Sequence, residues 1–269
     1  MIFADDSLQP GPTQPGLKQP ELTHIGGPTL LMKYAGLAFL TDPTFDAPGD
    51  YPMSNGRVLS KLSGPAVPAE QLGRIDVVLL SHDQHPDNLD KRGRELLPQA
   101  GAVLGTPAAA GRIGVVRGLR PWERAGLDGG ITATAVPALH GPEGAEAVTG
   151  EVTGFVLEAE GWPTVYVSGD NASLAVAAEI ARRFPDTALV IAFAGAARTA
   201  LFDGAPLTLT SEGVVELLDL FPAATVVPVH TEGWAHFSEG PEVLWKAVDD
   251  AGAAARVALL PAAGTPHRV

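Results

Sequence analysis

The segment LLSHDQHPDNLD, residues 79–90, decides how this sequence is interpreted. It starts at the end of an apolar run, residues 75–80, and then places two histidines and three carboxylates within nine residues. A buried strand that leads into a loop of such side chains is a common way to build an active site, because the strand holds the ligands in place. Histidine nitrogens and carboxylate oxygens suit zinc, iron or manganese. The same segment would also suit an ordinary polar turn, so the rest of the chain has to decide.

The composition limits the classes of protein to which the chain can belong. A hydrophobic fraction of 45% over 269 residues suffices for a large core. The net charge of -13, without a cluster of lysines and arginines, argues against a nucleic-acid partner. Because cysteine is absent, any metal must be held by His, Asp or Glu. The sequence shows neither a basic N-terminal leader nor an apolar run of membrane-spanning length, so we expect a cytoplasmic protein with no membrane partner.

Hydrophobic patterning predicts the fold class. Residues 1–20 are rich in proline and form an extension, and residues 21–269 form one domain. The early part of this domain is mostly β, with a hairpin predicted over residues 30–40. The later part alternates strands with helices, and its last predicted strand covers residues 256–260. A four-layer αβ/βα sandwich, in which two mixed β-sheets pack together and helices flank them, accommodates both parts, so the fold class is α/β (α+β).

Several predicted strands end at a residue that can bind a metal. One such strand leads into the segment quoted above, and three others are followed by a histidine or an aspartate and then by small or turn residues. A single polar residue after a strand is unremarkable, but a set of them indicates convergence on one edge of a sheet. The candidate metal ligands are His82, His85, Asp87, His140, Asp170 and His230.

Six short motifs, taken in order, resemble the metallo-β-lactamase fold superfamily, and specifically its lactonase-like branch of metal-dependent hydrolases. They span residues 24–234, and they are HIGG from His24, TDP from Thr41, SHDQHPD from Ser81, HGP from His140, SGD from Ser168 and HTEGW from His230. The resemblance implies an αβ/βα sandwich with its active site at one edge. It also implies that Asp170 bridges two metals, that His140 serves the first and that His230 serves the second.

The first histidine motif departs from the family pattern His-x-His-x-Asp-His. Counted forward from His82, the second histidine position holds Gln84, and counted from Asp87, the final histidine position holds Asn88. Amide oxygens are weaker ligands than imidazole for zinc-like ions. We therefore predict one tightly bound metal and a doubtful second site. Zinc is the expected ion, with iron and manganese as alternatives.

The resemblance implies hydrolysis of a small-molecule substrate by metal-activated water, at an ester, lactone, amide or phosphodiester bond. If Asp87 is not itself a ligand, it could orient or deprotonate that water, and Trp234, His236 and Phe237 could line the pocket. Two alternatives stay open: a member with a degraded site that only binds, and iron-dependent redox chemistry. The acidic charge disfavours a nuclease of this fold. The sequence is also compatible with a homo-oligomer.

Overall fold

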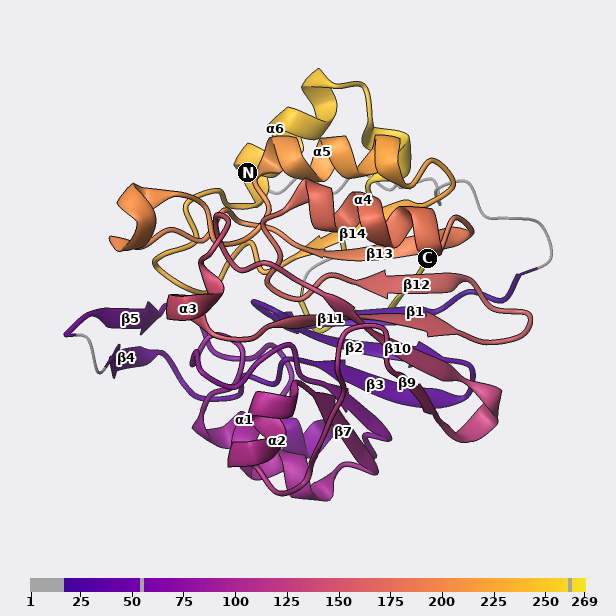
Figure 1. The fold of residues 1–269 in the computed structure, drawn as a ribbon, viewed down its shortest axis with the longest axis horizontal. Coiled ribbons are helices and arrows are strands. Elements are labelled where there is room, and N and C mark those ends of the chain that lie inside the picture. Colours follow the sequence, from indigo (N-terminus) through magenta and orange to yellow (C-terminus); the bar gives the residue numbers. More distant parts are fainter. Residues whose placement is uncertain (1–16, 54–55, 261–262) are drawn as a thin grey trace.

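Two β-sheets lie face to face at the centre of the protein, and helices cover their outer faces (Figure 1). The computed structural model describes residues 17–53, 56–260 and 263–269. Most of the predicted N-terminal extension, residues 1–16, therefore lies outside the described residues. The backbone N–H of Lys18 donates to the carbonyl of Gly161 at 3.0 Å, which attaches the start of the described chain to the domain.

The first sheet has seven strands in the order β15-β1-β2-β3-β6-β7-β8. Pairing is antiparallel from β15 to β3 and parallel from β3 to β8, so the sheet is mixed. Its buried central strand β6 is the apolar stretch that precedes the quoted segment. The strands are β1 Glu21–Gly26, β2 Thr29–Tyr34, β3 Leu37–Thr41, β6 Val77–Leu79, β7 Ala102–Gly105, β8 Val116–Gly118 and β15 His267–Arg268.

The second sheet has six strands in the order β14-β13-β12-β11-β10-β9. It is also mixed, because β9 to β12 pair antiparallel whereas β12, β13 and β14 pair parallel. Pro228 lies within β14, which a strand at the edge of a sheet tolerates because its missing N–H disrupts no central ladder. The strands are β9 Arg124–Gly126, β10 Thr132–Pro137, β11 Thr153–Glu158, β12 Thr164–Val167, β13 Thr187–Phe193 and β14 Thr225–Val229.

Helices and short turns complete the layers. Figure 1 shows α4, α5 and α6 over the second sheet and α1 and α2 beyond the first. The helices are α1 Lys91–Leu96, α2 Pro107–Arg112, α3 Glu146–Thr149, α4 Leu174–Arg183, α5 Ser211–Leu220 and α6 Pro241–Asp250. Turns of 3₁₀ helix cover Ala69–Gln71, Leu97–Gln99, Asp128–Gly130, Leu201–Gly204 and Ala254–Arg256. Within the described part of the chain, no helix is long and apolar enough to cross a membrane.

The hydrophobic core is layered in the same way. One cluster fills the space between the sheets and includes Tyr34 of the first and Phe155 of the second. A second cluster packs the outer face of the second sheet against α4, α5 and α6, and a third packs the outer face of the first sheet against α1 and α2. Each sheet thus buries both faces, which explains the near-continuous apolar runs of the central strands. The predicted four-layer sandwich is confirmed.

The structure lacks one predicted strand and contains a hairpin that was not predicted. The strand predicted over residues 256–260 does not form, and only Val257 bridges β14, at Val226. The side chain of Arg256 donates to the carbonyls of Leu218, Phe221 and Ala224, which fixes the start of this segment beside the end of α5 and the start of β14. A two-stranded hairpin, β4 Gly49–Pro52 with β5 Val58–Lys61, occupies the loop after β3, where no strand was predicted.

Two helical glycines give opposite expectations for the same substitution. A Cβ on Gly93 in α1 would lie 1.8 Å from the carbonyl oxygen of Pro43, whereas one on Gly111 in α2 would meet nothing within 4 Å. Gly93→Ala should therefore destabilise the protein by about 1–3 kcal/mol or more through overpacking. Gly111→Ala should stabilise it by up to about 1 kcal/mol through helix propensity. The urea unfolding midpoint measures both changes. If the two variants shift this midpoint in the same direction, the close packing at Gly93 is contradicted.

Candidate metal centre

Five strand ends meet at one edge of the sandwich. In the first sheet β3 and β6 run parallel, and they end next to Asp42 and to the loop of His82. In the second sheet β12, β13 and β14 are parallel. Strand β10 runs in the same direction as β12, because both are antiparallel to β11, which lies between them. The residues that follow β10, β12 and β14 are placed at the same edge, and they include His140, Asp170 and His230. All six predicted ligands lie in two groups at this edge.

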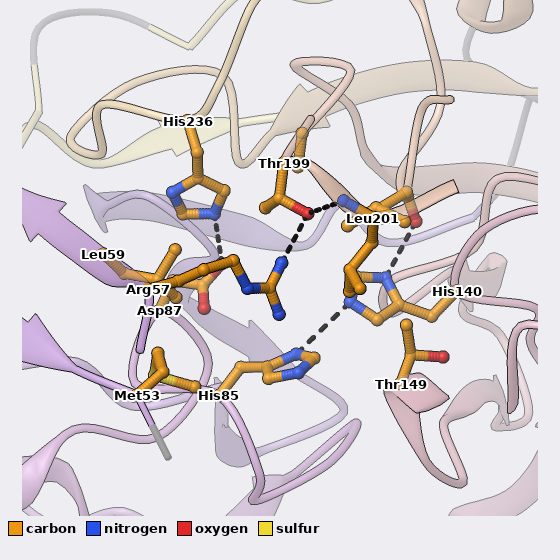
Figure 2. Close-up of a pocket in the computed structure, with 12 residues that line it drawn as sticks. Met53, Arg57, Leu59, His85, Asp87, His140, Thr149, Thr199, Leu201 and His236 are labelled. Atoms are coloured by element: carbon orange, nitrogen blue, oxygen red, sulfur yellow. Dashed lines mark hydrogen bonds and ion pairs between the residues drawn. The ribbon is translucent and has the colours of Figure 1, made fainter. Parts of the chain in front are cut away.

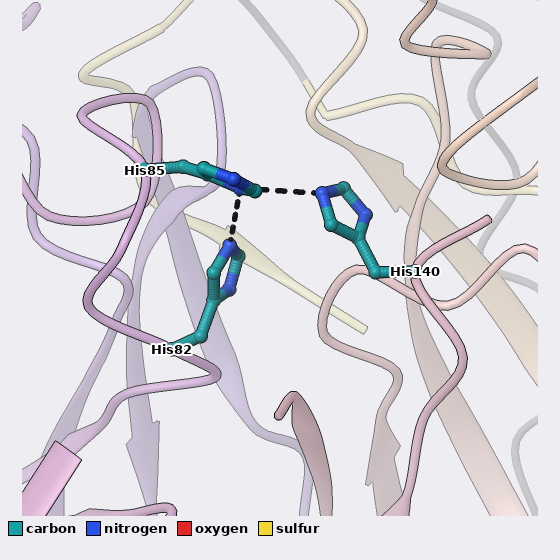
Figure 3. Close-up of side chains that lie close together, drawn as sticks. All are labelled: His82, His85 and His140. Atoms are coloured by element: carbon teal, nitrogen blue, oxygen red, sulfur yellow. Dashed lines mark hydrogen bonds between the residues drawn. The ribbon is translucent and has the colours of Figure 1, made fainter. Parts of the chain in front are cut away.

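The histidine cluster consists of His82, His85 and His140 (Figure 3). The Nδ1 atom of His85 lies 2.9 Å from Nε2 of His82 and 3.3 Å from Nε2 of His140. His85 reaches this place because the loop turns back on itself, with the N–H groups of Asn88 and Leu89 donating to the His85 carbonyl. Three ring nitrogens that face one another can share a cation as ligands.

The acidic cluster consists of Asp87, Asp170 and His230. Nε2 of His230 lies 3.6 Å from a carboxylate oxygen of each aspartate. Buried atoms of all three residues have no hydrogen-bond partner among the residues that the structure describes: Oδ1 of Asp87, Oδ2 of Asp170 and Nε2 of His230. Buried polar atoms are normally paired, so these orphaned atoms fit a bound cation that would satisfy them.

Backbone carbonyls orient two of the imidazoles. Nδ1 of His140 bonds the carbonyl of Leu207 at 2.8 Å, and Nδ1 of His230 bonds the carbonyl of Ala194 at 3.2 Å. A carbonyl can only accept, so Nδ1 carries a proton in each ring and Nε2 is the nitrogen available to a metal. Such outer hydrogen bonds are the usual way in which proteins orient a metal-binding histidine. His230 also adopts a positive φ of 62°, a strained conformation of the kind found at functional sites.

The pKa values of the histidines are shifted in opposite directions in the two clusters. Burial, with a smaller contribution from neighbouring imidazoles, lowers the pKa of His82 to about 3 and that of His85 to about 4. Both rings are therefore neutral near pH 7, the state in which imidazole binds metals. In the acidic cluster burial would lower the pKa of His230, but the carboxylates of Asp170 and Asp87 outweigh it and raise this pKa. The first cluster thus offers neutral nitrogens and the second offers negative charge.

Asp42 and Asn88 form a buried hydrogen-bond network next to Asp170. The Asp42 carboxylate accepts hydrogen bonds from the N–H and the hydroxyl of Ser81, both at 2.6 Å, and Nδ2 of Asn88 donates to Asp42 at 3.0 Å and to Asp170 at 3.1 Å. Burial raises the pKa of Asp42 to about 7. The amide of Asn88 thus joins two carboxylates. Although the TDP motif contains Asp42, sequence reasoning assigned it no role in the site.

A small cavity of about 30 Å³, partly open to solvent, borders both clusters at His85, His140 and Asp87 (Figure 2). His85, Asp87, His140 and His236 form its polar floor, and its walls also include Met53, Arg57, Leu59, Thr149, Ala197, Thr199, Leu201 and Leu207. Of the three aromatic residues considered for the pocket, His236 lines it, Trp234 is buried near Lys61, and Phe237 packs on the His230 ring at 4.0 Å. Sequence reasoning missed Arg57, because the hydrophobic pattern does not show that the β4–β5 hairpin packs beside Thr199, far away in the chain.

Comparison with known proteins gives a consistent result. The model of the β-lactamase superfamily domain family matches residues 38–231, which is most of the chain. Among curated proteins, the chain is 26% identical over 234 residues to the UPF0173 protein YddR of Bacillus subtilis, covering 83% of this chain and 90% of that protein.

Among the solved structures that share this fold are an isothiocyanate hydrolase and a possible metal-dependent hydrolase. The isothiocyanate hydrolase from Delia radicum gut bacteria superimposes with a TM-score of 0.80 at 24% identity, covering 92% of this chain and 98% of that one. A possible metal-dependent hydrolase from Veillonella parvula gives a TM-score of 0.80 at 20% identity, covering 93% and 99%. At these identities the likeness shows the fold and does not transfer a substrate.

Proposed function

This chain belongs to the metallo-β-lactamase superfamily, and from that premise we propose that it is a metal-dependent hydrolase with a small-molecule substrate. It would cleave an ester, lactone, amide or phosphodiester bond. The observation that carries the proposal is the histidine cluster, in which three ring nitrogens face one another beside the unsatisfied atoms of the acidic cluster.

Each cluster has a proposed role. His82, His85 and His140 would hold the first metal, and the acidic cluster would contribute to a second position. Zinc is the proposed ion because a three-histidine set with an open position is a common catalytic zinc site, and iron and manganese are the alternatives for the same donors. A bound ion of this kind lowers the pKa of its water and polarises the scissile group of the substrate.

Asp87 is the proposed orienting residue for the attacking water. Burial would raise the pKa of Asp87, but the imidazoles of His236 and His230 outweigh it and hold this pKa well below its usual range. A carboxylate with so low a pKa stays ionised and is a weak base. This supports a role in which Asp87 accepts a hydrogen bond from water, or binds a metal, rather than one in which it removes the proton outright.

The pocket walls suggest the chemical class of substrate. Arg57 directly precedes β5 in the β4–β5 hairpin, and Figure 2 shows its guanidinium between Thr199 and the floor of the cavity. Its Nη1 donates to Oγ1 of Thr199 at 2.7 Å. Arginine recognises carboxylate and phosphate groups through its fork of donors. With apolar side chains around it, this arrangement favours a small substrate that has an apolar part and an anionic group.

Metal analysis paired with an activity screen tests the proposal. Protein purified without chelator should contain zinc, and it should hydrolyse at least one member of a panel of esters, lactones, amides and phosphodiesters. Chelation should abolish that activity, and added zinc should restore it. Protein that binds metal but hydrolyses nothing would favour a binding role, and coloured protein that contains iron would favour redox chemistry.

Substitution of Arg57 tests the substrate class. Arg57→Ala should raise KM for an anionic substrate by roughly 10- to 150-fold, since a hydrogen bond to a charged group contributes about 1.5–3 kcal/mol. A neutral ester of similar size should be affected much less. The control is Arg117→Ala, because Arg117 is exposed on β8 and does not line the cavity. Equal KM changes for the two substrates would contradict anion recognition by Arg57.

A further inference from the structure

The acidic cluster lacks one imidazole of the superfamily pattern. It offers two carboxylates and one imidazole. The pattern would place a second imidazole at position 88, but there the chain has Asn88. Its Nδ2 faces Asp42 and Asp170. Turning the amide over would place its carbonyl against two carboxylates, so the assigned orientation is the favourable one. Asn88 therefore orients Asp170.

A different imidazole approaches the acidic cluster from the loop after β14. Nε2 of His236 lies 3.0 Å from Oδ2 of Asp87, and Nε2 of His230 lies 3.6 Å from the same oxygen. Nδ1 of His230 donates to the carbonyl of Ala194, so Nε2 is the nitrogen that faces the two carboxylates and can bind a cation. This Nε2 has no hydrogen-bond partner among the described residues. The position beside Oδ2 of Asp87 is thus suited to a cation, and His236 lies next to it.

The loop holds His236 in place from both sides. The backbone N–H of Arg198 donates to the His236 carbonyl at 2.9 Å, and the N–H of Ala235 donates to the carbonyl of Ser60 in β5 at 3.0 Å. The ring of Phe237 packs between those of His236 and His230, with centroid distances of 4.7 and 4.0 Å. The imidazole is therefore positioned before any ion binds, which lowers the entropy cost of binding.

We propose that His236 replaces the imidazole missing at position 88, and that the acidic cluster with His236 forms a second metal site. This inference rests on the proposed metal-dependent function. The site has two carboxylate and two imidazole donors, a set that suits zinc, iron and manganese. The sequence-based prediction of one tight metal considered only donors of the superfamily motifs. His236, two positions beyond the last of these motifs, adds the donor that they lack.

Metal counting tests the proposal. After expression with zinc and dialysis against metal-free buffer, mass spectrometry should find about two zinc ions per chain in the unsubstituted protein. His236→Ala should reduce this to about one. The matched control is His267→Ala, which should leave the count near two because His267 lies in β15 and belongs to neither cluster. If His236→Ala keeps both ions, the proposal is wrong.

Anomalous diffraction at the zinc edge gives a second measurement that does not depend on a variant folding. A coordinating His236 will have its Nε2 about 2.0–2.1 Å from the second ion. A distance beyond about 3 Å would show that His236 only donates a hydrogen bond to Asp87, and it would overturn the proposal. Unsubstituted protein with one ion overturns this inference alone, whereas unsubstituted protein with none also overturns the proposed function.

Discussion

Replacement of His140 by alanine is expected to remove the metal of the histidine cluster and with it the hydrolytic activity. His140 follows a strand of the second sheet, and its Nε2 contacts Nδ1 of His85 in the loop after the first sheet. Nδ1 of His140 donates to the carbonyl of Leu207. Loss of an outer hydrogen-bond partner typically costs 10- to 100-fold in affinity or activity, so loss of a ligand should cost more than about 100-fold. Zinc content after dialysis and kcat/KM for the best substrate of the screen measure both effects.

His267→Ala is the control for this experiment, because it also deletes an imidazole but lies on β15. Its metal content and activity should equal those of the unsubstituted protein. The thermal unfolding midpoint of apo His140→Ala should fall only slightly, since one neutral hydrogen bond contributes about 1 kcal/mol. Retention of both zinc and activity in His140→Ala would place the catalytic site elsewhere.

Replacement of Lys61 by methionine is expected to destabilise the fold by about 3–5 kcal/mol, the usual effect of breaking a buried ion pair. Nζ of Lys61 lies 2.8 Å from Oδ2 of Asp90, and the two side chains are only 4% and 0% exposed. Asp90 also accepts from the N–H groups of Asp46 and Gly93, the second of which caps α1. Without Lys61 a buried carboxylate would lose its only ion-pair partner among the described residues. Chemical denaturation measures the change.

Lys33→Met is the matched control. Nζ of Lys33 also lies 2.8 Å from a carboxylate, that of Glu21, but its side chain is 64% exposed. Surface ion pairs contribute about 0–1 kcal/mol, so this variant should be nearly as stable as the unsubstituted protein. Because the two pairs have the same length, the difference between the variants isolates the effect of burial. Similar stability losses in both would contradict this account of Lys61.

Lys61 also connects segments that carry residues of the metal centre. Lys61 is the last residue of β5, so it joins the hairpin that carries Arg57 to the end of the segment that carries His82 and His85. Its ammonium lies over the ring of Trp234, 5.7 Å from the centroid, in the loop of His236. One buried cation thus connects three segments around the cavity. We therefore expect Lys61→Met to weaken metal retention as well as the fold.

Much of the fold could be predicted from the sequence, because hydrophobic periodicity reports which faces are buried. The hairpin of β2 and β3 and the helices α4, α5 and α6 were predicted for this reason. Strand β15 and the hairpin of β4 and β5 were missed, because they contain few apolar residues and form through pairing with a partner. The strand predicted over residues 256–260 was wrong, because this segment pairs with β14 only at the Val257–Val226 bridge.

The sequence by itself determined which strand ends carry metal-type ligands, since a polar residue directly after a buried strand is a local pattern. Tertiary structure alone decided how those ligands are grouped. A turn in the loop brings His85 to His82, and the packing of the two sheets brings His140 to both. The placement of Arg57 and His236 is also a tertiary result, because each lies on a loop whose path depends on contacts with residues far away in the chain. No local pattern encodes such contacts, and the chemistry of the site depends on them.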